Sequence, residues 1–265
     1  MKKVFGFLAL SAFAVAFSSG AAAAAKTPKT ILAIFAHPDD ETGPGPALTM
    51  HAKTGKVHIA YVTDGRYGVR EGLGVAINSD ELVALRKEEG RCAAAARGLE
   101  APVFFGFPDQ IVGDATVIEQ IQRLSAATAR IVEEIERVSP DIVVTFGPGG
   151  YTGHPDHRLV GALVQQAMLS REWGDMRLLT FAPANSQVEI MDRAFPLIGQ
   201  SDASLNVAVH FGDDVLAVEE KAFRCHDSQF SPEQMDEILG ALARDTTNTR
   251  WFREVPLKQK VRKGF

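Results

Sequence analysis

Short, uninterrupted apolar segments that alternate with amphipathic segments restrict this chain to few folds. Residues 31–36 (ILAIFA), 57–63 (VHIAYVT) and 142–146 (IVVTF) are almost wholly apolar along their length, with no regular in-and-out alternation. That pattern is typical of strands buried on both faces of a parallel sheet. Segments 79–98 and 116–138 carry apolar residues at helical spacing. The sequence therefore predicts an α/β fold: a doubly wound, mainly parallel, Rossmann-like sheet with helices on both faces.

The remaining segments continue this alternation. We expect further strands at 102–105, 177–181 and 206–211 and further helices around 159–168, 213–225 and 232–244. Glycine-rich 65–74 predicts a loop, and 183–205 fits no regular element. The length after residue 25 suits one large α/β domain, 26–265, or at most two small ones.

Residues 1–25 have the features of a signal peptide. Lys2 and Lys3 precede an apolar stretch at 4–17, and the small residues of 18–25 offer the A-x-A cleavage pattern. An uncleaved membrane anchor is the alternative. We expect an exported protein, periplasmic or secreted, with no integral membrane segment after cleavage.

The net charge bears on the binding partners of the protein, and the cysteine content bears on disulfide bonds. Without Lys2 and Lys3, 26 basic and 33 acidic residues remain, a net charge of about −7, which argues against nucleic acid as the main partner. Cys92 and Cys225 are too few for a disulfide framework. Each lies in a helical pattern, so two buried thiols are the favoured interpretation, although an oxidising compartment would permit a bridge. The oligomeric state stays open.

Two motifs rich in histidine and aspartate follow predicted strands. AHPDDE occupies 36–41, directly after the first strand, and GHPDH occupies 153–157, after the fourth strand and a glycine-rich loop. In a strand order common to doubly wound sheets, 3-2-1-4-5, strands 1 and 4 are neighbours and flank the topological switch point, where ligands bind. We therefore expect an active site at the carboxyl ends of strands 1 and 4.

The side chains of these motifs suit a catalytic zinc site. Such a site has three protein ligands, commonly imidazole and carboxylate, and an open position for water. His37 and Asp40, three residues apart, can bind one Zn²⁺ from a single turn, and His157 can supply the third ligand. Iron(II) and cobalt(II) suit the same donors.

A metal-dependent hydrolase also needs a base and a proton donor. Asp39, beside the ligands, is the candidate base, and His154, held by Asp156, is the candidate donor to the oxyanion or leaving amine. Taken singly, Asp39 or Asp40 could instead cap a helix, and a lone loop histidine is often merely solvated. Two such motifs after two central strands favour the catalytic interpretation.

At these residues the chain resembles the LmbE/PIG-L family of N-deacetylases, which includes N-acetylglucosaminyl-phosphatidylinositol de-N-acetylases. The family signature, A-H-P-D-D-E followed by H-P-D-H, stands unbroken at 36–41 and 154–157. The similarity covers 30–230 and extends to Leu85-Arg86-Lys87-Glu88-Glu89, Phe107-Pro108-Asp109, Lys221 and His226-x-Ser228-Gln229.

The resemblance implies the roles already inferred from side-chain chemistry. The metal ligands are His37, Asp40 and His157, the base is Asp39 and the proton donor is His154. It also suggests Arg86 as a substrate-binding residue and His226 as part of the pocket wall. From the residues alone, Arg86 could be a solvated helix residue, and His226 a cation at a helix C-terminus. Glu41 is expected to support the metal loop rather than to bind the ion.

The predicted function is zinc-dependent hydrolysis of an N-acetyl or other N-acyl group on a small amino-sugar substrate that contains N-acetylglucosamine. A metal-dependent amidase or esterase acting on a non-sugar substrate, and a non-catalytic metal- or sugar-binding protein, are the alternatives. The loop at 147–153 lacks the Lys-Ser/Thr of a P-loop, and no G-x-S-x-G motif of a serine hydrolase is present.

Overall fold

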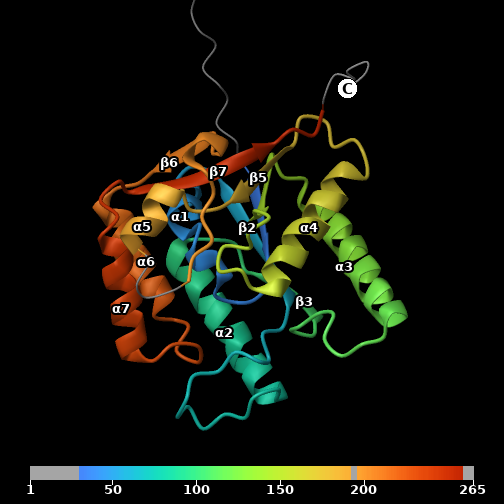
Figure 1. Cartoon of the computed structure of the whole chain (residues 1–265), viewed down its shortest axis with the longest axis horizontal. Coiled ribbons are helices and arrows are strands. Elements are labelled where there is room, and N and C mark those ends of the chain that lie inside the picture. Colours follow the sequence, from blue (N-terminus) through green and yellow to red (C-terminus); the bar gives the residue numbers. More distant parts are fainter. Residues whose placement is uncertain (1–29, 192–195, 259–265) are drawn as a thin grey trace, which may run out of the picture.

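A computed structural model describes residues 30–191 and 196–258, and it centres on a seven-stranded sheet (Figure 1). The strands are β1 (Thr30–Phe35), β2 (Lys56–Thr63), β3 (Val103–Phe107), β4 (Ile142–Phe146), β5 (Arg177–Phe181), β6 (Val207–His210) and β7 (Thr249–Val255). Their order is β3-β2-β1-β4-β5-β7-β6, and the first five run parallel. The predicted order 3-2-1-4-5 is therefore confirmed, with β1 and β4 as neighbours.

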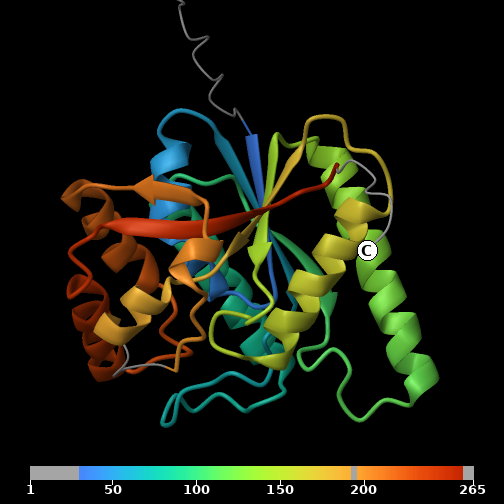
Figure 2. The same ribbon diagram turned by 45° about the horizontal axis from the view of Figure 1, so that its top comes forward.

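The helices cover both faces of the sheet, as predicted (Figures 1 and 2). They are α1 (Gly45–Ala52), α2 (Asp80–Arg97), α3 (Val117–Val138), α4 (Pro155–Leu169), α5 (Asn185–Met191), α6 (Asp213–Phe223) and α7 (Pro232–Ala243), with 3₁₀ turns η1 (Asp40–Thr42) and η2 (Asp202–Ser204). Helices α3 and α4 pack together on one face, and α1, α2 and α6 pack on the other. Because both faces are covered, the central strands are buried throughout: Leu32, Ile34 and Phe35 of β1 have no exposed area.

Three elements lie where the sequence pattern did not place them. Helix α5 lies inside 183–205, which was expected to be irregular, so that prediction is wrong for Asn185–Met191. Helix α1 begins at Gly45-Pro46, where proline suits the first turn of a helix. Its short sequence has little apolar periodicity, so the pattern did not predict it. In strand β7, charged residues at Arg250, Arg253 and Glu254 interrupt the apolar ones, so no apolar run marked it as a strand. It pairs antiparallel with β5 and β6.

The interpretation of Cys92 and Cys225 as two buried thiols is wrong. They form a disulfide, with their Cα atoms 5.8 Å apart. Cys92 is exposed on α2 and Cys225 is half-buried just after α6. Helical periodicity could not reveal the bond, because it arises from the packing of α2 against α6.

The proposed signal peptide, 1–25, lies outside the described residues. Across 30–191 and 196–258, no helix combines the length and hydrophobicity needed to traverse a bilayer.

Candidate active site

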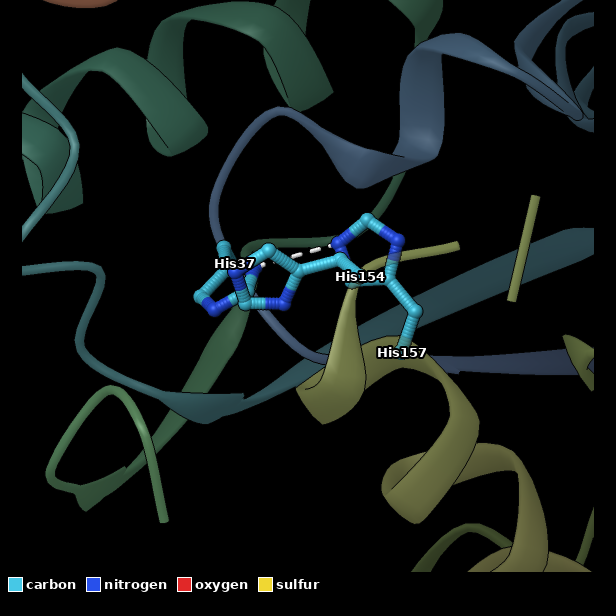
Figure 3. Close-up of side chains that lie close together, drawn as sticks. All are labelled: His37, His154 and His157. Atoms are coloured by element: carbon cyan, nitrogen blue, oxygen red, sulfur yellow. Dashed lines mark hydrogen bonds between the residues drawn. The ribbon is translucent and has the colours of Figure 1, made fainter. Parts of the chain in front are cut away.

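Turns that follow the parallel strands bring the two motifs together. His37 comes from the turn after β1, and His154 and His157 come from the start of α4 (Figure 3). The rings of His37 and His157 are in hydrogen-bond contact although 120 residues separate them in the chain. The adjacency of β1 and β4 creates this meeting.

His37 is oriented by Asp109, which follows β3. Its Nε2 donates to Asp109 Oδ1 at 3.0 Å, and Asp156 Oδ2 lies 3.6 Å from the same nitrogen. Burial alone would lower the pKa of His37, but the carboxylates of Asp109, Asp156 and Asp40 outweigh burial and hold that pKa well above its ordinary value. In its neutral form His37 therefore keeps its proton on Nε2 and leaves Nδ1 as a bare acceptor.

His157 presents the complementary nitrogen. Its Nδ1 donates to the carbonyl oxygen of Gly150 at 3.0 Å, which leaves Nε2 bare in the neutral ring. That Nε2 lies 3.3 Å from His37 Nδ1 and 2.9 Å from Asp40 Oδ1. Bare ring nitrogens that face each other and a carboxylate repel unless a cation lies among them.

The donor set fits a metal ion such as zinc. Ligands about 2.0–2.1 Å from a tetrahedral zinc ion lie about 3.3 Å from one another. His37 Nδ1 lies 3.3 Å from His157 Nε2 and 3.5 Å from Asp40 Oδ2, and His157 Nε2 lies 2.9 Å from the other Asp40 oxygen, Oδ1. Metal binding would replace the proton that the metal-free cluster holds.

Asp40 is the third donor that the geometry favours. Its Oδ2 accepts a hydrogen bond from the backbone N–H of His37 at 2.6 Å. Burial would raise the pKa of Asp40, but the charge of His157 and hydrogen bonds from both histidines hold it far below its usual range. The ring nitrogens of His37, His154 and His157 also lie within 4.8 Å of one another, so His154 is a further potential ligand.

Asp39 sits in a strained backbone conformation at the edge of this cluster. Its backbone angle φ is 126°, a value that residues other than glycine rarely adopt. Backbone strain of this kind concentrates at functional sites. Burial raises the pKa of Asp39 to about 6, although the positive charge of Arg86 opposes this rise. A carboxyl group with that pKa is matched to accept a proton near neutral pH.

Arg86 holds Asp39 in place. Its Nη2 donates to Asp39 Oδ2 at 2.9 Å and also to the carbonyl oxygen of Pro38, while Nη1 donates to that of Gly65 at 2.7 Å. The side chain borders the cavity but is only 2 % exposed. Its hydrogen bonds go to the protein, so the geometry supports positioning of Asp39 more directly than the predicted substrate contact.

The expected pairing of His154 with the Asp156 carboxylate is wrong. Asp156 is buried and its carboxylate accepts hydrogen bonds from the backbone N–H groups of Gln110 and Ile111. His154 caps α4 instead: its Nδ1 accepts from the backbone N–H of Asp156 at 3.2 Å. This contact places the proton of the neutral ring on Nε2. Burial and the neighbouring charges of His37 and His157 lower the pKa of His154, so the neutral form is favoured.

The prediction of His226 as a pocket residue is also wrong. His226 has no exposed area, and its Nε2 donates to Glu41 Oε1 at 2.8 Å, behind the Asp39 turn. Glu41 also accepts from Arg97 and from Tyr61 Oη, and its second oxygen accepts from the backbone N–H of Asp39. Burial would raise the pKa of Glu41, but the charges of His226 and Arg97 hold it at about 2. This buried network supports the turn that carries the candidate base.

Asp109 is the site residue that the motifs alone did not identify. In the sequence, Asp109 appeared only as part of the similar segment Phe107-Pro108-Asp109, and no role was predicted for it. Its backbone N–H donates to Asp64 Oδ1 at 3.1 Å, so residues after β2 and β3 together orient His37. An aspartate just after a third parallel strand is the signal that pointed to this edge of the sheet.

A cavity of about 400 Å³ opens over the cluster. His37, Asp39, Asp40, His154 and His157 all border it. Tyr67 and Gly68, from the predicted glycine-rich loop, form part of its rim, together with Gln110. Apolar side chains from α5, α6 and α7 form another part of the wall.

Comparison with known proteins identifies the class. Residues 32–168 match the PIG-L family, described as GlcNAc-PI de-N-acetylase. The match covers more than half of the chain and includes both motifs. The chain therefore belongs to the PIG-L family.

Individual relatives are more distant. A 1D-myo-inositol 2-acetamido-2-deoxy-alpha-D-glucopyranoside deacetylase of Mycolicibacterium vanbaalenii is 28% identical over 234 residues, 76% of this chain and 81% of the relative. A protein of the same description from Rhodococcus opacus is 34% identical over 164 residues, 54% of this chain and 56% of the relative. The N,N'-diacetylchitobiose deacetylase from Pyrococcus horikoshii shares the fold, with a TM-score of 0.64 and 21% identity over 88% of this chain and 85% of that one.

Proposed function

We propose that the protein is a zinc-dependent hydrolase that removes an N-acetyl or related N-acyl group from a small amino-sugar substrate. One observation carries the proposal: the facing ring nitrogens of His37 and His157 and the carboxylate of Asp40 converge beside Asp39, a strained and partly buried carboxyl group with a pKa of about 6. The names of the relatives support the substrate class, since both curated relatives are described as deacetylases of an acetamido sugar.

His37, Asp40 and His157 would hold the ion. Bound there, zinc would supply a Lewis acid and lower the pKa of a bound water to about 7. Asp109 and the Gly150 carbonyl fix the outer nitrogens of the two imidazoles, so the inner nitrogens keep their direction.

The other site residues move protons. Asp39 accepts a proton from the attacking water as the water oxygen bonds to the amide carbon. His154 keeps its proton and donates a hydrogen bond from Nε2–H to the developing oxyanion. When the C–N bond breaks, the proton on Asp39 passes to the leaving nitrogen, and the products are a carboxylic acid and a free amine.

The direct test measures acetate and free-amine release from N-acetylglucosamine-containing compounds by the zinc-loaded mature protein. We expect Asp39→Asn to retain zinc and to lose about 10²-fold or more in rate. An unchanged rate would contradict the assignment of Asp39 as the base. Hydrolysis of esters without amide turnover would favour an esterase, and no turnover of any substrate would favour a binding protein.

We also propose that the chain is exported after cleavage near residue 25. The lysine, apolar and small-residue segments at 1–25 support this, and the Cys92–Cys225 disulfide suits an oxidising compartment. Mass spectrometry of the protein from periplasm and medium tests it, because a full-length N-terminus confined to the cytoplasm would contradict export.

A further inference from the structure

The cavity wall divides by chemistry. Its apolar side chains come from the C-terminal part of the chain: Met191, Leu197, Phe223, Phe230, Ile238 and Leu242. Helices α5, α6 and α7, which supply or flank them, lie together at one side of the molecule (Figures 1 and 2). No charged side chain of these helices borders the cavity within the described residues.

The opposite part of the lining is polar. Besides the catalytic cluster it includes Tyr67, Gln110 and Thr152, which offer hydroxyl and amide groups. Tyr67 belongs to the loop after β2, Gln110 to the loop after β3 and Thr152 to the loop after β4. These groups suit the hydroxyls of a sugar, whereas the apolar side offers sugar hydroxyls no partner.

The apolar side is larger than an acetyl group needs. A single methyl group cannot cover side chains from three helices together with Phe230 of the segment between α6 and α7, whose ring centroid lies 5.2 Å from that of Phe223. Ile238, Leu242 and Phe230 are only partly buried and face the open cavity. Apolar surface left facing a water-filled cavity is characteristic of a site that receives an apolar ligand group.

An N-acylated amino sugar has the same division, because its amide joins a hydroxyl-rich ring to a hydrocarbon chain. We propose that the apolar side is an acyl-chain subsite and that the preferred substrates are N-acylated amino sugars with an acyl group longer than acetyl. The sugar lies against the polar loops, and the chain lies along α5, α6 and α7. This inference rests on the proposed amidase function and extends it to the substrate class.

The test is the dependence of kcat/KM on acyl length, measured with N-acetyl-, N-butanoyl-, N-hexanoyl- and N-octanoylglucosamine and the zinc-loaded mature protein. Each buried CH₂ should raise kcat/KM about threefold, so that hexanoyl exceeds acetyl by roughly a hundredfold. Ile238→Asn and Leu242→Asn should each reduce this hexanoyl-to-acetyl ratio about tenfold. Ile118→Asn, at a 69% exposed position on α3, is the matched control and should keep the ratio.

The outcomes separate this inference from the proposed function. Acetyl hydrolysis that depends on zinc and Asp39 but does not increase with chain length overturns the subsite and leaves the amidase intact. A ratio unchanged in both Ile238→Asn and Leu242→Asn also overturns it. If kcat/KM rises when N-acetylglucosamine carries an octyl aglycone, but not when its acyl chain is lengthened, the apolar side binds the aglycone and the acyl-chain subsite is rejected. Absence of hydrolysis of every N-acyl sugar rejects the proposed function, and the inference with it.

Discussion

Asp39 owes its geometry to neighbours rather than to its own conformational preference. The backbone N–H donates to Glu41 Oε2 at 3.0 Å, and the carboxylate accepts from Arg86 at 2.9 Å. Strained residues persist only where such contacts over-determine them. The position of the candidate base therefore depends on its contacts with Glu41 and Arg86.

Glu41→Gln tests this network. The amide has one acceptor oxygen in place of two, so the Asp39 N–H or the Arg97 and His226 donors lose a partner, and we expect a loss of about 3 kcal/mol in the free energy of unfolding at pH 7. The folded-state pKa of Glu41, about 2, lies below its ordinary value, so its contribution is present above pH ~4.5 and is lost as pH falls toward 2. Urea unfolding of both proteins should therefore show the difference shrinking from pH 5 toward pH 2.

The matched control is Glu133→Gln, an exposed glutamate paired with Arg130 on α3. Its effect should stay within about 0.5 kcal/mol, because exposed ion pairs contribute little. Equal effects of the two substitutions would contradict a special role for Glu41.

At the scale of elements, the glycine-rich loop after β2 contains a close approach to Arg86. Gly65 has φ +68°, and a Cβ there would lie 2.2 Å from Arg86 Nη1. Gly72 has φ +78° but would place its Cβ in open space. The positive φ favours glycine at both positions, but only Gly65 contacts Arg86, the residue that holds Asp39.

We therefore expect Gly65→Ala to displace Arg86 and lower kcat by at least tenfold, whereas Gly72→Ala shows only backbone strain, on the order of 1 kcal/mol in stability. Steady-state kinetics with thermal unfolding of both variants measures this. Equal kcat values in the two variants would mean that Arg86 does not need its contact at Gly65.

The disulfide joins α2 to the end of α6 across 133 residues of chain. Cys92→Ser with Cys225→Ser should lower the free energy of unfolding by about 2–5 kcal/mol, because the unfolded chain regains the freedom that the bond removed. Urea unfolding with and without a reductant should show that the double variant no longer responds to reduction. Identical midpoints for the wild-type and double-variant proteins under oxidising conditions would contradict the expectation.

For the whole molecule, the candidate metal site joins parts of the chain that contribute to different strands. A ligand that binds only the folded state stabilises it by mass action, about 4 kcal/mol at a free concentration 1,000 times Kd. We expect zinc added to chelator-treated protein to raise Tm by roughly 10 °C. His157→Ala should abolish the shift, whereas His58→Ala, remote on β2, should retain it. A shift that survives His157→Ala would remove His157 from the ligand set.

Much of the fold was determined by local sequence. The runs at β1, β2 and β4 specify buried parallel strands by composition alone, and two H-P-D motifs at strand ends place the candidate ligands where β1 and β4 must lie side by side. The strands and motifs need only a few neighbouring residues, and the strand order common to doubly wound sheets then predicted that His37 and His157 meet.

Tertiary structure alone decided the features that depend on which elements pack together. Asp109 reaches His37 across 72 residues, and Glu41 reaches His226 across 185. The Cys92–Cys225 bond likewise arises from the packing of α2 against α6, and the apolar side of the cavity from side chains that α5, α6 and α7 bring together. Periodicity specifies which face of a helix is apolar but not which neighbour covers it, because burial is non-directional and many pairings satisfy one pattern.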